Sequence, residues 1–152
     1  MTTKLFRSKV LLSLSLLFVS GLVAAGPEMV VYKTKTCGCC SKWVEHLRAK
    51  GFTVTVKEVD SMVETHRKLG VPANLQSCHT GAVNGYSIEG HVPAADITRL
   101  LKEHPKARGL AVPGMPAGSP GMEVDRKDAY SVMLFQASGE ATVYKSYPGD
   151  GK

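Results

Sequence analysis

The pattern of apolar and polar positions from residue 29 onward alternates between strand-like and helix-like stretches. Met29 to Thr34 is apolar and β-branched, which predicts a short buried strand. A helix is predicted from about Cys39, because apolar residues then recur at the i, i+4, i+7 spacing of one helix face. That face consists of Cys40, Val44 and Leu47. Phe52 to Lys57 alternates apolar and polar side chains, as a half-buried strand does.

Local signals predict the next elements as well. Ser61 to Glu64 has the form of a capping box, which predicts the start of a short helix. An extended segment starts at Cys78, and Asn84-Gly85 is a strong signal for a hairpin turn. Another helix follows Gly90 to Pro93 and ends before Pro105, since proline cannot continue a helix. The predicted order is therefore strand, helix, strand, helix, hairpin and helix.

This order resembles the thioredoxin/glutaredoxin fold and predicts an α/β, thioredoxin-like domain over residues 26–105. A C-x-x-C pair, Cys37 and Cys40, stands at the first strand–helix junction, as in a redox motif of the thioredoxin kind. The resemblance departs at the cis-proline loop of that fold. Pro72 precedes the third predicted strand, but Cys78 and His79 stand closer to the place where the loop would face the motif.

Residues 106–152 are predicted to form a C-terminal extension that packs on the same domain. Its first part, Gly109 to Met122, is rich in Gly and Pro and is predicted to be neither helix nor sheet. Two Pro-Gly-Met turns end at Met115 and Met122, and each turn presents a thioether. We interpret this part as a segment that wraps the domain and supplies ligands, and a flexible linker is the alternative. Strand-like runs between residues 130 and 147 predict a terminal β-hairpin.

The first 25 residues have the composition of a cleaved export signal. A basic segment precedes an apolar run, Val10 to Val19, which is short for a membrane span. Val23-Ala24-Ala25 then provides the small residues that a signal peptidase needs. We expect an exported chain that starts near Gly26 and has no membrane attachment after cleavage. An uncleaved anchor is the alternative.

Charge and length limit the partners of this mature chain. The sequence has 19 basic and 13 acidic residues, and removal of the signal leaves 16 and 13, a net charge of +3. So small and dispersed an excess is not the footprint of a nucleic-acid-binding protein. The remaining length suits one domain with one core. Export permits disulfides, but three cysteines within four positions cannot all pair locally.

Those three cysteines lie in one turn, Cys37-Gly38-Cys39-Cys40, at the start of the predicted helix. Backbone N–H groups and the positive end of the helix dipole favour the thiolate there. A thiol–disulfide oxidoreductase would use Cys37 as its nucleophile and Cys40 as its resolving thiol. Cys39 has no place in such a pair, and three adjacent thiolates repel one another unless a cation holds them, which favours a soft-metal site. Burial of three small residues in the core is a third interpretation.

The complete set of soft donors favours Cu(I) as the metal. The candidate ligands are four cysteines, two methionines and two histidines: Cys37, Cys39, Cys40, Cys78, Met115, Met122, His79 and His91. Methionine is a poor zinc ligand, and an iron–sulfur cluster would leave the methionines without a role. The other histidines, His46, His66 and His104, lie on or at the ends of predicted helices and are expected to face solvent. Bridging would allow the thiolates to share several copper ions.

Four motifs, in order, resemble the CopG-type copper-resistance proteins of Gram-negative bacteria. They are Cys37-Gly38-Cys39-Cys40, Ser77-Cys78-His79-Thr80, Glu89-Gly90-His91-Val92-Pro93 and Val112 to Glu123. The resemblance covers nearly the whole mature chain. It implies a periplasmic thioredoxin-like domain with a C-terminal extension, and a cluster of copper ions bridged by cysteine sulfur. It also implies an oxidoreductase that interconverts Cu(I) and Cu(II) and assists an efflux system.

The residues and the resemblance together predict copper binding with redox exchange. Two alternatives stay open on the sequence: a thiol–disulfide oxidoreductase with Cys37 and Cys40 as its catalytic pair, and a copper carrier that never cycles electrons. The expected partners are copper ions and periplasmic components of a copper efflux system, and the expected oligomeric state is a monomer.

Overall fold

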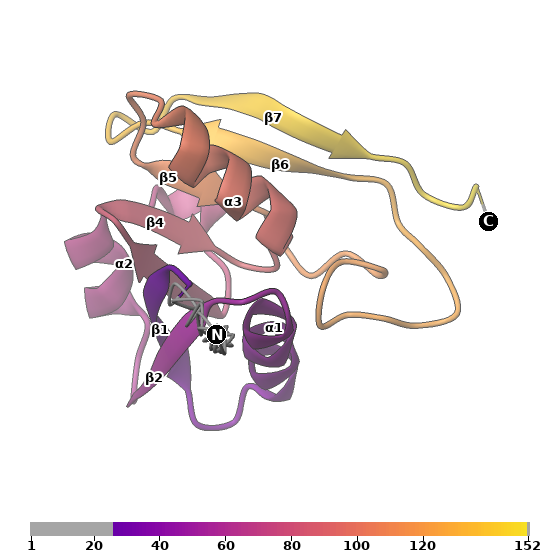
Figure 1. Ribbon diagram of the computed structural model, residues 1–152, viewed down its shortest axis with the longest axis horizontal. Helices are drawn as coiled ribbons and strands as arrows, with labels where there is room; N and C mark the ends of the chain where they lie inside the picture. The colour runs from indigo at the N-terminus through magenta and orange to yellow at the C-terminus, as the bar shows by residue number, and fades with distance from the viewer. Residues whose placement is uncertain (1–25, 152) are drawn as a thin grey trace, which may run out of the picture.

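The computed structural model describes residues 26–151, so the predicted export signal lies outside the described residues. Figure 1 shows a mixed α/β architecture. The strands are β1 (Glu28–Thr34), β2 (Thr53–Val59), β3 (His79–Val83), β4 (Tyr86–Glu89), β5 (Gly109–Ala111), β6 (Tyr130–Phe135) and β7 (Ala141–Tyr147). The helices are α1 (Gly38–Ala49), α2 (Val63–Leu69) and α3 (Ala94–Glu103), with a 3-10 turn η1 (Ala73–Leu75). The predicted α/β class is confirmed, and none of the helices in residues 26–151 has the length and apolarity that crossing a membrane requires.

The seven strands form one sheet in the order β2-β1-β3-β4-β5-β6-β7. β1 is parallel to β2 and antiparallel to β3, and β3 and β4 form the predicted hairpin. Its turn has Asn84 at φ 45° and Gly85 at φ 83°, the left-handed backbone that this dipeptide favours. β5 is parallel to β4, and β6 and β7 follow as the predicted terminal hairpin. The extension therefore continues the sheet of the first part of the chain.

Apolar clusters cover both faces of this sheet. The larger cluster joins α1 and α3 to one face, and its members include Trp43, Leu47, Ile88, Ile97, Leu100 and Leu110. A smaller cluster contains Leu75, Ala111 and Phe135. Because Leu110 and Ala111 are successive residues of β5, their side chains point to opposite faces, so the smaller cluster lies on the other side.

The prediction that Gly109 to Met122 contains no strand is wrong for its first three residues, which form β5. This strand is buried between β4 and β6. Gly109 is not a turn signal here, because a Cβ at this position would collide with the carbonyl oxygen of Ser87 in β4. The two strands approach closely only where one of them has no side chain.

The predicted capping box at Ser61 is not formed. Met62 is the residue that precedes α2, and its side chain makes no capping hydrogen bond. The Ser61 hydroxyl oxygen instead accepts a hydrogen bond from the Val63 N–H at 3.3 Å. A local turn therefore satisfies the serine before the helix starts.

The predicted strand at Phe52 to Lys57 is present as β2, but its burial is lower than expected. Phe52 is buried just before the strand and Val54 is partly buried, whereas Val56 is 37% exposed. β2 is one of the two edge strands of the sheet, so neighbours cover it less completely.

Between β5 and β6 the chain runs beside α1 (Figure 1), and Gly121 lies against the first turns of this helix. Gly121 approaches so closely that a Cβ there would lie 2.8 Å from the Trp43 backbone nitrogen and 2.9 Å from the Cys39 carbonyl oxygen. A hydrogen bond joins the two ends of this segment: the Asp128 carboxylate accepts it from the Ala117 N–H at 2.9 Å. The Gly- and Pro-rich segment is therefore packed against the cysteine turn.

Replacing Gly109 with Ala is expected to lower the free energy of unfolding by about 3 kcal/mol, because the added methyl group meets backbone that cannot move aside. Chemical denaturation followed by circular dichroism measures this change. Gly38→Ala is the control, since nothing lies within 4 Å of a Cβ built at Gly38. An equal loss of stability in the two variants would contradict this account of β5.

Candidate metal centre

The cysteine turn lies where β1 ends and α1 begins. Cys37 is the N-cap residue of α1, and its N–H donates a hydrogen bond to the Thr34 carbonyl oxygen at 3.3 Å. α1 then starts at Gly38, so Cys39 and Cys40 belong to its first turn. Their sulfurs therefore lie at the positive end of the helix dipole, near backbone N–H groups that have no partner within the helix.

A disulfide joins two of the three cysteines in this turn. Cys37 and Cys40 form it, with their Cα atoms 5.4 Å apart. Cys40 is fully buried, whereas Cys37 is partly exposed. Cys39 and Cys78 are free thiols, and each is half-buried. The structure therefore contains an oxidised pair with two reduced sulfurs beside it.

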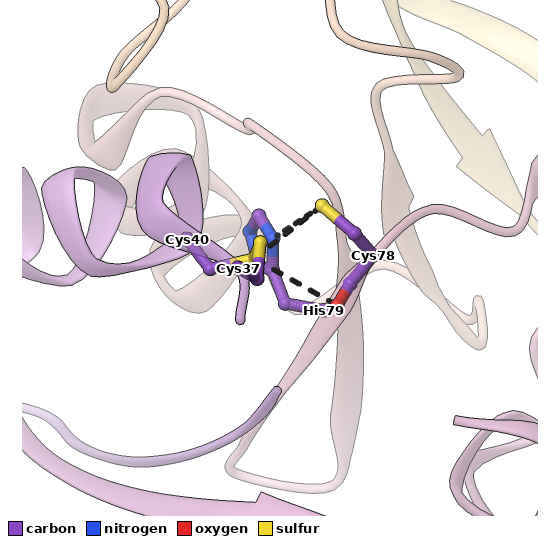
Figure 2. A group of neighbouring side chains, drawn as sticks. All are labelled: Cys37, Cys40, Cys78 and His79. Carbon is purple, nitrogen blue, oxygen red and sulfur yellow. Dashed lines mark hydrogen bonds between the residues drawn. A yellow bond between two sulfur atoms is a disulfide. The ribbon is translucent and has the colours of Figure 1, made fainter. Parts of the chain in front are cut away.

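Cys78 contacts the disulfide from a different part of the chain. It stands in the loop directly before β3, and its Sγ lies 3.4 Å from the Cys40 Sγ. Figure 2 shows the Cys78 side chain pointing toward the disulfide. Residues 26–151 contain no cis peptide bond, and the residue that contacts the disulfide from the loop before β3 is Cys78.

Cys39 connects the sulfurs to the extension. Its Sγ lies 3.6 Å from the Cys37 Sγ and 3.9 Å from the Met115 Sδ. Met115 is 54% exposed, so its thioether lies at the outer side of the turn. Met122 belongs to the same segment, and its backbone N–H donates to the Ser119 carbonyl oxygen at 2.8 Å. No hydrogen bond within residues 26–151 joins the Met122 thioether to a cysteine sulfur.

Two buried histidines lie beneath the sulfurs. His79, at the start of β3, and His91, after β4, are fully buried, and their rings meet edge to face with centroids 5.0 Å apart. Trp43 packs on the other side of His79 at a centroid distance of 4.5 Å, and its Nε1–H donates to the Val92 carbonyl oxygen at 2.8 Å. The His79 Nδ1 lies 3.6 Å from the Cys78 Sγ. The His79 imidazole thus packs between Trp43 and His91.

The hydrogen bonding of His91 determines its tautomer. Its Nδ1 lies 2.8 Å from the Pro120 carbonyl oxygen, which can only accept, so Nδ1 carries the proton. Nε2 is then an unprotonated acceptor, and it is buried without a hydrogen-bond partner. The Nε2 of His79 is also buried without a partner. A metal-binding histidine has this arrangement, in which one nitrogen is anchored to the protein and the other is available.

Potential ligand atoms converge in two overlapping groups. One group consists of Cys37, Cys40, Cys78 and His79, and the other of Cys39, Cys78 and His91. Within each group, one ligand atom per residue lies within 4.8 Å of the others. Because both groups contain Cys78, they form one continuous site. The structure thus brings six of the eight predicted ligands together, adds Met115 through Cys39, and leaves Met122 without such a contact.

Burial keeps the imidazoles of this site neutral and the Cys78 thiol protonated. It lowers the pKa of His79 to about 3, with a smaller effect of His91 in the same direction. Burial also lowers the pKa of His91. Burial, followed by the charge of Cys39, raises the pKa of Cys78 to about 11. The imidazoles can therefore bind a metal without losing a proton, whereas Cys78 must release one.

The chain matches a family model and two solved structures. The family model, described as a protein of unknown function, DUF411, matches residues 75–122. The two structures, titled copper resistance protein copG, forms 1 and 2, are 49% and 48% identical to this chain, each with a TM-score of 0.77. The matches cover 82% and 81% of this chain and 99% of each of those chains. This chain belongs to the CopG family of copper resistance proteins. No curated protein matches it.

The resemblance predicted from the four motifs is thereby confirmed. The family model covers the part of this CopG-family chain that contains Cys78, both site histidines and both Pro-Gly-Met turns. The family model does not include the Cys37–Cys40 turn. The two structural matches extend over most of the chain.

Sequence reasoning missed a buried carboxylate close to the cysteine site of this CopG-family protein. Glu89 is fully buried, and its carboxylate accepts hydrogen bonds from the Thr80 hydroxyl and the Ser77 N–H, each at 2.5 Å. The prediction that His66 faces solvent is wrong, since it is 5% exposed and its Nε2 lies 3.2 Å from a Glu89 oxygen. A charged residue at the end of a strand resembles a surface residue in sequence, so the pattern carried no signal for this contact.

The other two excluded histidines differ from each other. His104 is exposed, as predicted. His46 is partly buried, and its Nε2 accepts a hydrogen bond from the Ala94 N–H at 3.2 Å, at the start of α3.

The unfolding free energy of the copper-free protein is expected to fall as pH is lowered. His79 stays neutral in the fold until about pH 3, whereas the unfolded chain protonates it near pH 6.5, so protons favour unfolding between these values. The loss attributable to His79 is on the order of 3 kcal/mol by about pH 4. Denaturant titrations at several pH values measure it. His79→Phe should reduce the slope of the unfolding free energy against pH. His104→Asn, at an exposed position, should leave this slope unchanged. Equal slopes in the wild type and both variants would contradict the neutral state of His79.

Proposed function

We propose that this CopG-family protein binds several copper ions in a cluster bridged by cysteine sulfur, and that it interconverts Cu(I) and Cu(II). The observation that carries the proposal is the position of Cys78 in both ligand groups, because one sulfur within reach of both can bridge ions. Thiol, thioether and imidazole donors together select Cu(I) over harder cations. The copper-resistance title of the two related structures supports the same metal.

The donors divide into bridging and terminal ligands. The bridging thiolates are Cys37, Cys39, Cys40 and Cys78. His79 and His91 are neutral terminal ligands, which agrees with their buried nitrogens without hydrogen-bond partners. Met115 completes or covers the site from the extension, and we assign the same role to Met122 on the basis of the paired Pro-Gly-Met turns.

The Cys37–Cys40 disulfide links copper binding to electron transfer. A disulfide sulfur is not a thiolate, so the pair must be reduced before it can bridge copper. Reduction breaks the S–S bond and takes up two electrons and two protons. Two Cu(I) ions supply these electrons when they are oxidised to two Cu(II). In the reverse direction the dithiol reduces two Cu(II) to two Cu(I), releases two protons and forms the S–S bond again.

We place this function in the periplasm, with copper exchanged between the site and components of an efflux system. The disulfide suits an oxidising compartment. The export signal predicted for residues 1–25 supports the same location. The exposed thioether of Met115 provides a soft contact point for copper at the edge of the site.

A thiol–disulfide oxidoreductase is the second candidate, and the disulfide is the observation that favours it. In that function Cys37, the more exposed sulfur of the pair, attacks a substrate disulfide and Cys40 resolves the mixed disulfide. The contact of Cys40 with Cys78 and the unpaired nitrogens of the two histidines have no role in this reaction. Copper binding explains these features, and dithiol exchange leaves them unexplained.

Replacing Cys39 with Ser separates these two functions. We expect the reduced wild-type protein, loaded anaerobically, to retain more than one copper ion per chain, and Cys39→Ser to lose part of that copper because Cys39 belongs to one ligand group. Elemental analysis against protein concentration measures the ratio. Alkylation and mass spectrometry check that the Cys37–Cys40 disulfide still forms in both proteins. An unchanged copper content would contradict the cluster and favour the dithiol function.

Replacing Met115 with Leu tests the contribution of the extension. The change nearly conserves volume, so the stability of the copper-free protein should change little, while Cu(I) retention against a chelator should weaken by about tenfold. Copper-free and loaded proteins are compared side by side, because bound metal stabilises the fold by mass action. Met122→Leu should have a smaller effect. A double variant that matches the wild type in copper spectrum and retention would make the segment a linker only.

A further inference from the structure

A buried carboxylate lies under the loop that carries Cys78, and the function proposed above does not use it. Glu89, the last residue of β4, is fully buried. A carboxylate removed from water is unfavourable unless hydrogen bonds compensate it. One Glu89 oxygen accepts the Thr80 hydroxyl and the other accepts the Ser77 N–H, each at 2.5 Å. The His66 Nε2 lies 3.2 Å from the second oxygen, although not at a hydrogen-bonding angle.

Ser77 connects this carboxylate to the copper site. Residues 76–78 have no helix or strand geometry, so the Ser77 N–H has no secondary-structure partner and Glu89 accepts it. The Ser77 hydroxyl lies 3.9 Å from the Cys78 Sγ and 3.5 Å from the Gly114 carbonyl oxygen. Ser77 therefore lies between the thiol of Cys78 and the segment that carries Met115.

The other side of this loop is open. A groove of about 460 Å³ borders it, lined by Met62, Val63, His66, Gln76, Ser77, Cys78, Gly114 and Met115. Side-chain packing from the groove side therefore does little to hold the loop. The hydrogen bond from the Ser77 N–H to Glu89 holds the loop from its buried side, because the carboxylate that accepts it is itself fixed inside the fold.

We propose that Glu89 is a positioning residue that, through Ser77, holds Cys78 at the place where it joins the two ligand groups. The inference rests on the copper function proposed above and adds a support that is not itself a ligand. Position matters because the Cys78 Sγ lies 3.4 Å from the Cys40 Sγ and also belongs to the group with Cys39. A displaced loop would separate this sulfur from both groups.

A measurement on copper-free protein tests the positioning directly. In a Cys39→Ser background with the Cys37–Cys40 disulfide intact, Cys78 is the single free thiol. Glu89→Gln keeps the size of the side chain but presents an amide N–H₂ to one of its two donors. We expect a several-fold faster alkylation of Cys78 by a maleimide. Thr80→Val is the matched control, since it removes the other donor to the carboxylate and leaves the Ser77 contact, and its rate should stay close to that of the parent protein. An unchanged rate in Glu89→Gln, or an equal rise in both variants, would overturn the proposal.

Copper retention provides the second measurement, in protein with all four cysteines. Glu89→Gln is expected to lower Cu(I) retention against a chelator by about 10- to 100-fold, the usual cost of losing a residue that supports a metal ligand. Unchanged retention would overturn the proposal. If Glu89→Gln does not fold, Glu89→Asp tests the same contact, because the shorter side chain keeps a carboxylate but withdraws it from the Ser77 N–H. Unchanged Cys78 reactivity in that variant would overturn the proposal. The alkylation rates are measured without metal. If the wild-type protein bound no copper, the proposed copper function would be refuted, and the alkylation rates would still show whether Glu89 positions Cys78.

Discussion

The antiparallel pairing of β1 with β3 is the constraint on which the metal site depends. β1 ends at Thr34, just before the cysteine turn, and β3 starts at His79, just after Cys78. In the observed register Lys33 pairs with His79, which brings the two short segments to the same edge of the sheet. A slip of two residues would keep the same side chains buried but would move Cys78 by about 7 Å, and the contact between its sulfur and that of Cys40 would be lost. The backbone pairing therefore decides whether four sulfurs form one site.

The C-terminal extension adds the second side of this site. Its strands continue the sheet beyond β4, and the segment between β5 and β6 returns across the start of α1. Three contacts follow from that path: Met115 approaches Cys39, the Pro120 carbonyl oxygen accepts from His91, and Gly121 packs on the α1 backbone. A dithiol at a helix N-terminus needs none of these contacts. They place soft and neutral donors around it, which is what a copper site requires.

Local signals in the sequence predicted much of this fold, and contacts between distant segments account for what they missed. The Asn84-Gly85 turn and the helix after the cysteine turn depend on residues close in sequence, and both are found. β5 was missed because glycine usually indicates a turn. Gly109 is instead required in a strand, since Ser87 of the neighbouring strand approaches too closely for any side chain. The burial of His66 was missed because its partner, Glu89, lies on another element.

The same distinction applies to the candidate site. Residue type pointed to the cysteines, because soft donors are rare and their chemistry is specific. Local position pointed to His79, which adjoins Cys78, and to His91, which lies in a turn before a predicted helix. Their convergence, and the tautomer of His91 that Pro120 determines, depend on the fold. Glu89 could not be identified from its residue type, since its role depends on the backbone of Ser77 rather than on a motif of side chains.

The central claim is that these donors hold a cluster of copper ions bridged by sulfur. X-ray absorption spectroscopy at the copper edge, on reduced protein loaded with Cu(I) under anaerobic conditions, tests it most directly. The account predicts copper–sulfur scattering together with a short copper–copper vector, and loss of that vector when Cys78 is replaced by Ser. A spectrum with copper–sulfur scattering but no copper–copper vector at full loading would contradict it.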